Sequence, residues 1–477
     1  MKTKRFKLIA AIMIAFYATG IITAIHAVMT VRTPQGAIAW SVSLVSFPFI
    51  AVPAYLVFGR SKFEGMVQAY DARRTEIEAL EAQVRHNIDP WVAEAETRPA
   101  VYNAVRTLTG MALTRGNDVE LLIDGEATFV SLLKGIAQAR DYILFQFYMI
   151  HDDELGRRVQ QALIERAEAG VRVYVLYDEV GSSGLPWTYV DKLSKAGVEV
   201  SAFKATQGAR NRFQLNFRNH RKMVVVDGVT GWVGGHNVGD EYLGHDPEFT
   251  PWRDTHVRLE GPVVTQLQAV IAQDWYWATR KIPKLTWTPR AAANGNVRAM
   301  ITPTAPTTQL ETSGLLFVAA LDSAQERIWI TAPYFVPDEA VIKALQLAAL
   351  RGVDVRILTS GKGDSLAVHL AAFHYIELLQ GLGIKFYAYQ PGFLHEKVML
   401  IDHDISAVGT ANFDNRSFRL NFEVTALIAD PAFASETESM LERDFAHAVE
   451  IDPKSFSERP FWWRLGVDLS RLAAPVL

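Results

Sequence analysis

Residues 219–227 read Asn-His-Arg-Lys-Met-Val-Val-Val-Asp, and residues 394–402 read Leu-His-Glu-Lys-Val-Met-Leu-Ile-Asp. Each segment sets a lysine two residues after a histidine and ends in an aspartate, and the residues before that aspartate are apolar. The shared residues are His220, Lys222 and Asp227 in the first segment and His395, Lys397 and Asp402 in the second. Such an apolar run is typical of a buried β-strand. The sequence therefore predicts one polar motif on each of two strands.

The period of a strand predicts which of these side chains lie together. Alternate residues of a strand share a face, so the histidine and the lysine of each motif are expected to point the same way. Asp227 has the opposite parity and precedes Gly228 at an evident turn, and Asp402 occupies the matching place. All six residues are candidate catalytic residues, and we expect the two aspartates to contribute through orientation and local structure.

The sequence around the motifs is repeated too. A strand, a helix and a second strand are predicted over 142–148, 154–169 and 171–176, and again over 327–331, 338–350 and 352–358. Gly170 and Gly352 end the two helices. After the motifs, Gly234-Gly-His-Asn237 parallels Gly409-Thr-Ala-Asn412. Duplication on this scale predicts two α/β domains, each a mixed sheet flanked by helices, related by pseudo-twofold symmetry.

Length and composition agree with several domains and a membrane segment. A chain of 477 residues is too long for one compact core, and 49% hydrophobic residues is high for a wholly soluble protein. The net charge of −4 gives no reason to expect a nucleic-acid partner. The chain has no cysteine, which excludes disulfides, thiolate zinc sites, iron–sulfur clusters and cysteine nucleophiles.

Two apolar runs near the N-terminus, about 8–28 and 36–58, are each long enough to cross a bilayer as a helix. Six basic residues flank the pair of runs, at Lys2, Lys4, Arg5, Lys7, Arg60 and Lys62, whereas the short connection between the runs offers only Arg32 and the titratable His26. The positive-inside rule then predicts a transmembrane hairpin with both ends in the cytoplasm. A cleaved signal peptide is the alternative for the first run, because a basic segment also precedes such peptides.

The chain is thus expected to have four parts. Residues 1–60 form two transmembrane helices, and residues 61–111 form a helical connector. The first and second α/β domains occupy residues 112–290 and 291–477.

The paired motifs suit chemistry on a phosphodiester. Two ammonium groups offset the charge of the phosphate and stabilise the charge that develops in the transition state. One neutral imidazole can attack phosphorus while the other donates and accepts a proton. A single His-x-Lys is more often a solvent-exposed pair on an edge strand, but two copies with identical spacing favour a site. Zinc is the other alternative, and lysines beside the histidines would repel it, so we expect no metal.

The two motifs, each followed by a Gly-x-x-Asn turn, resemble the duplicated signatures of the phospholipase D superfamily. The resemblance implies a phosphohistidine intermediate and no cofactor, with His220 as nucleophile and His395 as acid and base, or the reverse. It also implies that Asn237 and Asn412 lie near the phosphate. By the same likeness Asp254 and Glu423 hold the histidines by hydrogen bonds. For either acid, an ordinary surface charge is the alternative.

Other segments are similar to bacterial cardiolipin synthases. They are residues 32–40, 55–59, 122–127, 234–244, 412–418 and 471–477. This likeness implies transfer of a phosphatidyl group from one phosphatidylglycerol to another with release of glycerol. Its implied partners are phosphatidylglycerol, other anionic phospholipids and the bacterial inner membrane, with the catalytic domains in the cytoplasm and no particular oligomeric state. Gly234-Gly235 against Gly409-Thr410 departs from the repeat and indicates that the halves are not equivalent.

Three alternatives stay open. A phospholipase D-type hydrolase or nuclease, or another phosphatidyltransferase, would use the same residues on a different acceptor or ester. A catalytically silent membrane scaffold would keep the fold without the reaction.

Two more features fit a lipid substrate. A basic group before the first motif would attract anionic head groups, although a solvated loop is the alternative; its members are Lys204, Arg210, Arg212, Arg218 and Arg221. The aromatic segment 461–467, Phe-Trp-Trp-Arg-Leu-Gly-Val, fits a membrane interface or, equally well, core packing.

Overall fold

The computed structural model describes residues 2–59, 62–71, 73–95, 97–207, 216–307, 310–363, 366–452, 458–472 and 474. The chain divides into two compact units. The N-terminal unit contains Met1–Ala72, Lys204–Phe217 and Pro306–Gln309, and the main unit contains the rest. Arg60, Arg210 and Arg212, which the sequence analysis singled out, lie outside the described residues.

The N-terminal unit is helical. Its helices are α1 (Lys2–Thr30), α2 (Pro34–Ser46), α3 (Pro48–Phe58) and α4 (Glu64–Asp71). One helix of the described residues, over Lys4–Thr30, is long and apolar enough to cross a membrane. The second apolar run, expected as one helix over 36–58, is instead α2 and α3, because the backbone leaves the helical region at Phe47 (φ −134°) and Pro48 has no N–H to continue the ladder.

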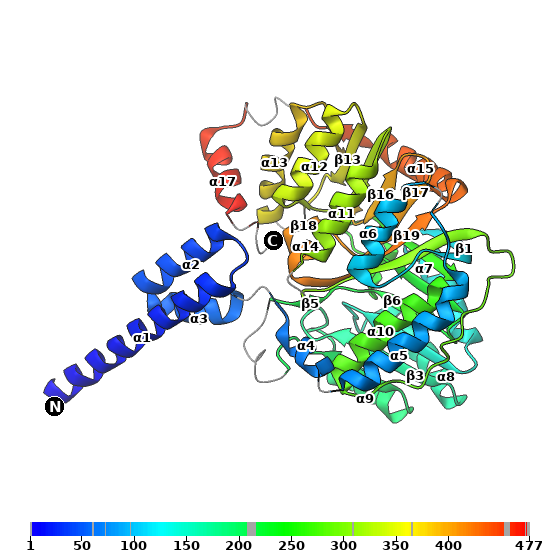
Figure 1. Ribbon diagram of the computed structural model, residues 1–477, viewed down its shortest axis with the longest axis horizontal. Coiled ribbons are helices and arrows are strands. Elements are labelled where there is room, and N and C mark those ends of the chain that lie inside the picture. The colour runs from blue at the N-terminus through cyan, green and yellow to red at the C-terminus, as the bar shows by residue number, and fades with distance from the viewer. Residues whose placement is uncertain are drawn as a thin grey trace. The chain divides into compact units, whose positions relative to one another are not determined.

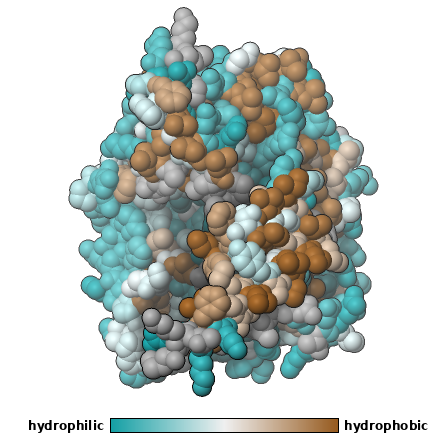
Figure 2. Space-filling model, turned by 90° about the vertical axis from the view of Figure 1, so that its left-hand side faces the viewer, coloured by the Kyte–Doolittle hydropathy of each residue, from teal (hydrophilic) through white to brown (hydrophobic). Residues whose placement is uncertain are grey.

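Small residues allow these helices to pack closely. A Cβ on Gly20 of α1 would lie 2.4 Å from the carbonyl oxygen of Leu44 in α2, so only glycine fits there. The buried cluster of this unit consists of Ala24, Ala27, Leu44, Ala51, Val52 and Tyr55. Large apolar side chains face outward instead, and Figure 2 shows them as a brown area on the face that it presents. Small residues inside and large apolar residues outside are typical of helices in lipid.

The main unit is built on one sixteen-stranded mixed sheet. Its first-half strands are β1 (Thr114–Ile123), β2 (Tyr142–Phe147), β3 (Arg172–Asp178), β4 (Glu199–Phe203), β5 (Arg218–Asn219), β6 (Met223–Val226), β7 (Thr230–Gly234) and β9 (Thr255–Glu260). Its second-half strands are β10 (Val297–Thr304), β11 (Arg327–Thr331), β13 (Asp354–Ser360), β14 (Lys385–Tyr389), β16 (Val398–Ile401), β17 (Ile405–Gly409), β19 (Asn421–Ala429) and β20 (Ala448–Glu450). Two-stranded pairs join β12 (Phe335–Val336) to β18 (Phe413–Asp414), and β8 (Trp252–Arg253) to β15 (Phe393–Leu394).

The strands of the two halves follow the same order outward from a central pair, β1 and β10. One side runs β1-β9-β7-β6-β2-β3-β4, and the other runs β10-β19-β17-β16-β11-β13-β14-β20. Both predicted β-α-β units are present, since β2 pairs parallel with β3 and β11 pairs parallel with β13. Their crossover helices are α8 (Glu154–Glu168) and α12 (Glu339–Leu350), close to the predicted bounds.

Helices flank this sheet (Figure 1). The others in the main unit are α5 (Arg74–Ile88), α6 (Pro99–Thr109), α7 (Asp124–Gln138), α9 (Trp187–Lys195), α10 (Val263–Thr279), α11 (Thr312–Ser323), α13 (Leu366–Gln380), α14 (Asn415–Arg419), α15 (Pro431–Ala446) and α17 (Phe461–Arg471), with the short helices η1 (Asp89–Trp91) and η2 (Asp240–Leu243). A large apolar core lies in each half. In Figure 1 the first half, cyan to green, lies below the second half, yellow to orange.

Candidate active site

Both histidines lie in short connections rather than inside the single strands that the sequence predicted. His220 follows the two-residue strand β5, and His395 follows β15. The strands break here because β5 pairs with β19 of the second half and β15 pairs with β8 of the first. The backbone N–H of His220 donates to Phe422 O at 3.0 Å, and that of His395 donates to Arg253 O at 2.8 Å. Each histidine is therefore held by the other half of the main unit.

Each histidine side chain likewise contacts a carboxylate of the other half. His220 Nδ1 lies 3.0 Å from both carboxylate oxygens of Glu423, and His395 Nδ1 lies 2.7 Å from Asp254 Oδ2. Both carboxylates are buried. The expected contacts of Asp254 and Glu423 with the histidines are thus present, and each crosses from one half to the other.

The two carboxylates are supported differently. Glu423 accepts hydrogen bonds from the hydroxyls of Thr410 (2.6 Å) and Ser417 (2.9 Å) and from the amide of Asn421 (3.1 Å). The Asp254 carboxylate accepts the backbone N–H of Thr255 at 2.8 Å. The residue that matches Thr410 is Gly235, where a Cβ would lie 2.0 Å from Asp254 Oδ1. The Gly-Gly of the first half therefore makes room for a carboxylate that sits against the backbone.

The two lysines lie beside the histidines. Lys222 Nζ donates to the carbonyl oxygen of His220 at 2.7 Å, and Lys397 Nζ donates to that of His395. Both lysines are buried. Burial lowers the pKa of Lys222, and the charge of Lys397 lowers it further, so the two ammonium groups act on one another. A phosphate anion would relieve that repulsion.

Both imidazoles are neutral in this arrangement. Burial lowers the pKa of His220 to about 4, against the opposing charge of Glu423, and the charges of Lys222 and Lys397 lower it as well. Burial and Lys397 lower the pKa of His395 to about 3, although Asp254 opposes this. Lys222 also lowers the pKa of His395, so each lysine acts on the histidine of the other half. If Nδ1–H is donated to the carboxylate, Nε2 keeps a free lone pair.

Burial alone would raise the pKa of both carboxylates. The neighbouring His220 and Lys222 outweigh burial and lower the pKa of Glu423. His236, His395 and Lys397 do the same for Asp254. Both acids are therefore charged at neutral pH, and each can stabilise an imidazolium at Nδ1.

Aromatic rings that the motifs did not predict pack against the two histidines. The Tyr148 ring lies 4.9 Å from the His220 ring and 5.1 Å from Lys222 Nζ. The Trp252 ring lies 5.2 Å from the His395 ring, and the Tyr242 ring 6.3 Å from it. Tyr148 directly follows β2, and sites in α/β sheets lie at the carboxyl ends of strands, so its position was an available signal.

The two motif asparagines differ in their contacts. Asn237 Oδ1 accepts the N–H of Met149 at 3.1 Å, and its amide donates to the Tyr242 hydroxyl at 2.7 Å. Asn412 Oδ1 is buried without a hydrogen-bond partner. Asn237 thus orients the ring beside His395, whereas Asn412 has an unused acceptor.

Asp227 and Asp402 bind backbone rather than the histidines. The Asp227 carboxylate accepts the N–H groups of Arg140, Asp141 and Tyr142 at 2.8–2.9 Å. Asp402 accepts those of Gln325, Glu326 and Arg327. Each aspartate therefore holds the start of the strand beside its own motif, β2 or β11.

The basic group predicted before the first motif is not one surface patch. Arg221 is buried, and its guanidinium contacts both carboxylate oxygens of Asp274 at 2.8 Å. It also donates to the carbonyl oxygen of Thr304 in the second half at 2.9 Å. Arg221 therefore joins the halves rather than attracting head groups.

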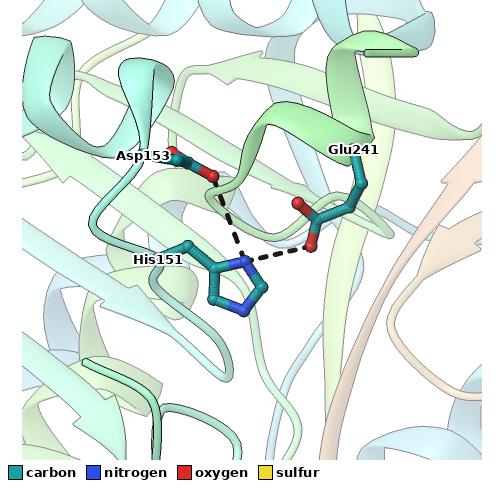
Figure 3. A group of neighbouring side chains, drawn as sticks. All are labelled: His151, Asp153 and Glu241. Carbon is teal, nitrogen blue, oxygen red and sulfur yellow. Dashed lines mark ion pairs between the residues drawn. The ribbon is translucent and has the colours of Figure 1, made fainter. Parts of the chain in front are cut away.

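One group among the described residues has donor atoms close enough for a metal ion (Figure 3). His151 Nδ1 lies 3.3 Å from Glu241 Oε1 and 4.0 Å from Asp153 Oδ2. The Asp153 carboxylate already accepts the N–H groups of Gly156 and Asp240, at 2.8 and 2.7 Å. These contacts join the loop after β2 to η2, and the group contains neither motif histidine.

Comparisons with known proteins agree on one family. The family described as "Cardiolipin synthase, PLD-like domain" matches residues 132–275 and 317–445, once in each half. The family described as "Phospholipase_D-nuclease N-terminal" matches residues 20–60. Cardiolipin synthase A of Pseudomonas fluorescens strain Pf-5 is 50% identical over 463 residues, which cover 96% of each chain. That of Pseudomonas aeruginosa strain PAO1 is 47% identical and covers 98% of this chain and 96% of its own.

A solved structure shows the same fold. The phosphatidylserine synthase of Haemophilus influenzae superposes with a TM-score of 0.59 at 12% identity, covering 79% of this chain and 100% of its own. Two matches of one family description, together with near-complete alignment at about half identity, assign this chain to a family. It belongs to the cardiolipin synthases of the phospholipase D superfamily.

Proposed function

We propose that this chain transfers a phosphatidyl group from one phosphatidylglycerol to another, giving cardiolipin and glycerol, through a phosphohistidine. It is then a phosphatidyltransferase and a bacterial membrane protein whose partners are anionic phospholipids. The observation that carries the proposal is the reciprocal pairing His220–Glu423 and His395–Asp254 beside two buried lysines. The extent of the similarity to cardiolipin synthase A supports the choice of substrate.

In the first step His220 Nε2 attacks phosphorus, and the bond from phosphorus to the glycerol oxygen breaks. His395, protonated at Nε2, gives its proton to the departing alkoxide. The anionic phosphodiester favours that imidazolium, because an opposite charge within a few ångströms raises a histidine pKa. Lys222 and Lys397 stabilise the charge on the non-bridging oxygens.

In the second step His395 takes the proton of a hydroxyl on the second phosphatidylglycerol. That oxygen attacks phosphorus, and the bond from phosphorus to His220 breaks. Glu423 and Asp254 accept the Nδ1–H of their histidines throughout, so that Nε2 is the reacting nitrogen in both steps. The same arrangement accommodates the reverse assignment of the two histidines.

We also propose pseudo-twofold symmetry between the halves, supported by their matched strand orders and matched histidine–carboxylate contacts. Within that scheme Asn412 Oδ1 accepts a hydrogen bond from a substrate hydroxyl, and Asp227 and Asp402 act through local structure. The proposed divisions are 1–60, 61–111, 112–290 and 291–477, and neither a cofactor nor a nucleic-acid partner is part of the proposal.

For the membrane segment we propose a hairpin in which α1 crosses the bilayer outward and α2 with α3 returns, leaving the main unit in the cytoplasm. Because the chain has no cysteine, single cysteines at Lys4, Arg32 and Lys62 report the topology without a background. An impermeant maleimide added to intact spheroplasts should label only Arg32→Cys. Labelling of Lys62→Cys under those conditions would refute the hairpin.

A product assay tests the reaction itself. Purified protein given phosphatidylglycerol labelled in its acyl chains should yield labelled cardiolipin and free glycerol. Phosphatidic acid as the main product would make the chain a hydrolase, and another phosphodiester would make it a different phosphatidyltransferase. His220→Ala and His395→Ala should each abolish transfer in a folded protein, and substantial turnover that persists in either variant would contradict the proposed chemistry.

The crossed pairing makes a sharper prediction. Glu423→Gln should impair the same step as His220→Gln, and Asp254→Asn the same step as His395→Gln, each by roughly 10²–10⁴-fold. The amount of labelled phosphohistidine that can be trapped distinguishes a variant that forms the intermediate slowly from one that breaks it down slowly. Asp430→Asn is the matched control, since Asp430 only caps α15 through the N–H of Phe433 at 2.9 Å. If Glu423→Gln impairs the same step as His395→Gln, the pairing of Glu423 with His220 does not explain the kinetics.

A further inference from the structure

Helix α17 presents an apolar stripe whose side chains are exposed except at the half-buried Leu465. Phe461, Leu465, Leu469 and Leu472 follow the i, i+4, i+8 and i+11 spacing of one helix face, and Trp462 lies beside them. Trp462 is 76% exposed and Leu472 is 71% exposed. Large apolar residues gathered on one side of a helix mark an interaction surface.

The opposite face of α17 holds the helix in place. The Trp463 ring packs on Phe373 of α13 at 4.9 Å, and Val467 is buried. Arg471 Nη1 lies 3.0 Å from His374 Nε2. The helix is therefore fixed on α13 through its inner face. The stripe lies on the opposite, outer face of the helix.

The stripe lies near the end of the sheet that carries the chemistry. β13 ends at Ser360, whose hydroxyl accepts the N–H of Leu394, the neighbour of His395, at 3.3 Å. α13 starts at Leu366, and α17 contacts its first half at Leu370, Phe373 and His374. Helix α17 therefore lies on the side of the second half where His395 is placed.

Three arginines lie at or just before α17, and the acidic residues Glu458 and Glu377 lie near them. Arg459 stands before the helix with its guanidinium 5.3 Å from the Trp463 ring, and Arg464 and Arg471 lie on the helix. Asp468 points toward α13, where its carboxylate lies 3.7 Å from His374 Nδ1. Aromatic and leucine side chains beside arginines match the composition of helices that lie in the head-group region of a membrane.

We propose that the outer face of α17 docks the main unit onto an anionic lipid bilayer, with Phe461, Trp462, Leu469 and Leu472 inserted at the interface. The docking holds the His220–His395 site against the surface that supplies the phosphodiester. The proposal rests on the proposed function only in that the substrate is a bilayer lipid. A protein occupant, α2 or α3 of the same chain or a second copy, is the competing outcome.

Spectroscopy tests the occupant independently of turnover. The chain has no cysteine, so Leu469→Cys can carry a single environment-sensitive fluorophore in the full-length protein. In vesicles of phosphatidylglycerol and phosphatidylcholine we expect emission at shorter wavelength and quenching by nitroxide-labelled acyl chains. The matched control is Trp187→Cys, at a 73% exposed residue of α9. Emission like the control, or blue-shifted emission that lipid nitroxides do not quench, would overturn the proposal.

Kinetics test the consequence. Trp462→Glu/Leu469→Glu should lower transfer on vesicles by at least about tenfold, because two apolar contacts with the bilayer are lost. The rate with a short-chain, monomeric phosphatidylglycerol should stay unchanged, and Trp187→Glu should alter neither rate. Equal rates on vesicles, or equal losses on both substrates, would overturn docking. If the parental protein makes no cardiolipin from either substrate while lipid quenching persists, the proposed function fails and the docking surface stands.

Discussion

Gly235 and Thr410 occupy matching places in the two halves, and each accommodates the carboxylate that contacts a histidine in a different way. In the second half the Thr410 hydroxyl donates to Glu423, which reaches His220 with a longer side chain. In the first half the shorter Asp254 sits so close to the backbone that no Cβ fits at residue 235. Carboxylate length and the neighbouring residue are therefore matched within each pair.

Gly235→Ala tests this match. The new methyl group would force the Asp254 carboxylate away from His395, so we expect transfer to fall roughly 10²-fold or more, the usual contribution of an oriented acid–base group. Gly184→Ala is the control, because its Cβ would meet nothing within 4 Å. Initial rates and thermal unfolding in detergent measure both effects. A Gly235→Ala protein with parental rates would show that this contact does not matter.

Burial of the histidines also makes stability depend on pH. The pKa of His220 is lowered from 6.5 to about 4, so between these values the unfolded chain binds more protons than the folded one. The neutral, buried His220 therefore costs the folded state no protonation energy above about pH 6.5. As the pH falls toward 4, the free energy of unfolding decreases on its account by up to about 1.4 kcal/mol per pH unit.

His220→Gln should thus flatten the loss of stability on acidification. We expect its unfolding free energy to fall less steeply than that of the parental protein between about pH 6.5 and 4.5. Denaturant unfolding at the two pH values measures the slopes. His245→Gln, at an exposed histidine, controls for the loss of one imidazole. Equal slopes in His220→Gln and the parental protein would contradict the burial effect.

At the scale of elements, each motif aspartate fixes the start of a strand. Asp227 has φ 53° and Asp402 has φ 47°, both in the left-handed region that aspartate tolerates better than most residues. From these turns the carboxylates reach the first N–H groups of β2 and β11. The aspartates that end the two motifs therefore support the sheet that carries the histidines.

Asp227→Ala should lower stability rather than chemistry. Three N–H groups lose their acceptor, and we expect a loss of about 1–3 kcal/mol, with a smaller loss in Asp227→Asn, which keeps one acceptor oxygen. The transfer rate per folded molecule should stay within a small factor of the parental rate. Unfolding midpoints and rates normalised to folded protein measure this. A large loss of rate at unchanged stability would make Asp227 part of the chemistry.

At the scale of the whole molecule, Arg253 joins the two halves. Its guanidinium contacts Asp444 and Glu396 of the second half at 2.8 Å and Asp124 of the first at 3.0 Å. Arg253 is buried, and burial raises the pKa of Glu396 against the opposing charge of Arg253. A buried guanidinium held by acidic residues of both halves fixes how the halves meet.

Arg253→Met should therefore cost several kcal/mol, about 3–5, because Asp444 and Glu396 are left buried without their partner. Arg258→Met is the control, since Arg258 pairs at the partly exposed surface with Glu120 and Glu260 and should cost less than about 1 kcal/mol. Denaturant unfolding compares them. Similar losses in both variants would mean that the buried network does not hold the halves together.

The sequence alone determined the local features of this protein. Duplicated motifs, apolar strands and glycine-ended helices predicted both β-α-β units, because hydrophobic period and turn chemistry act over a few residues. It also predicted the candidates His220, Lys222, His395, Lys397, Asp254 and Glu423, which lie in contact in the structure, but it gave no role to His236 beside Asp254. Hydropathy predicted the long apolar helix α1, but the break at Phe47-Pro48 depended on the local backbone.

The partner of each site residue, in contrast, follows from the tertiary fold. His220 binds Glu423 at a separation of 203 residues, and His395 binds Asp254 at a separation of 141. Arg221 was likewise expected as a surface charge, but it is buried and paired with Asp274. Hydrogen bonds act over about 3 Å in space whatever the distance along the chain. The crossing therefore follows from the way β5 meets β19 and β15 meets β8, a pairing that no local pattern encodes.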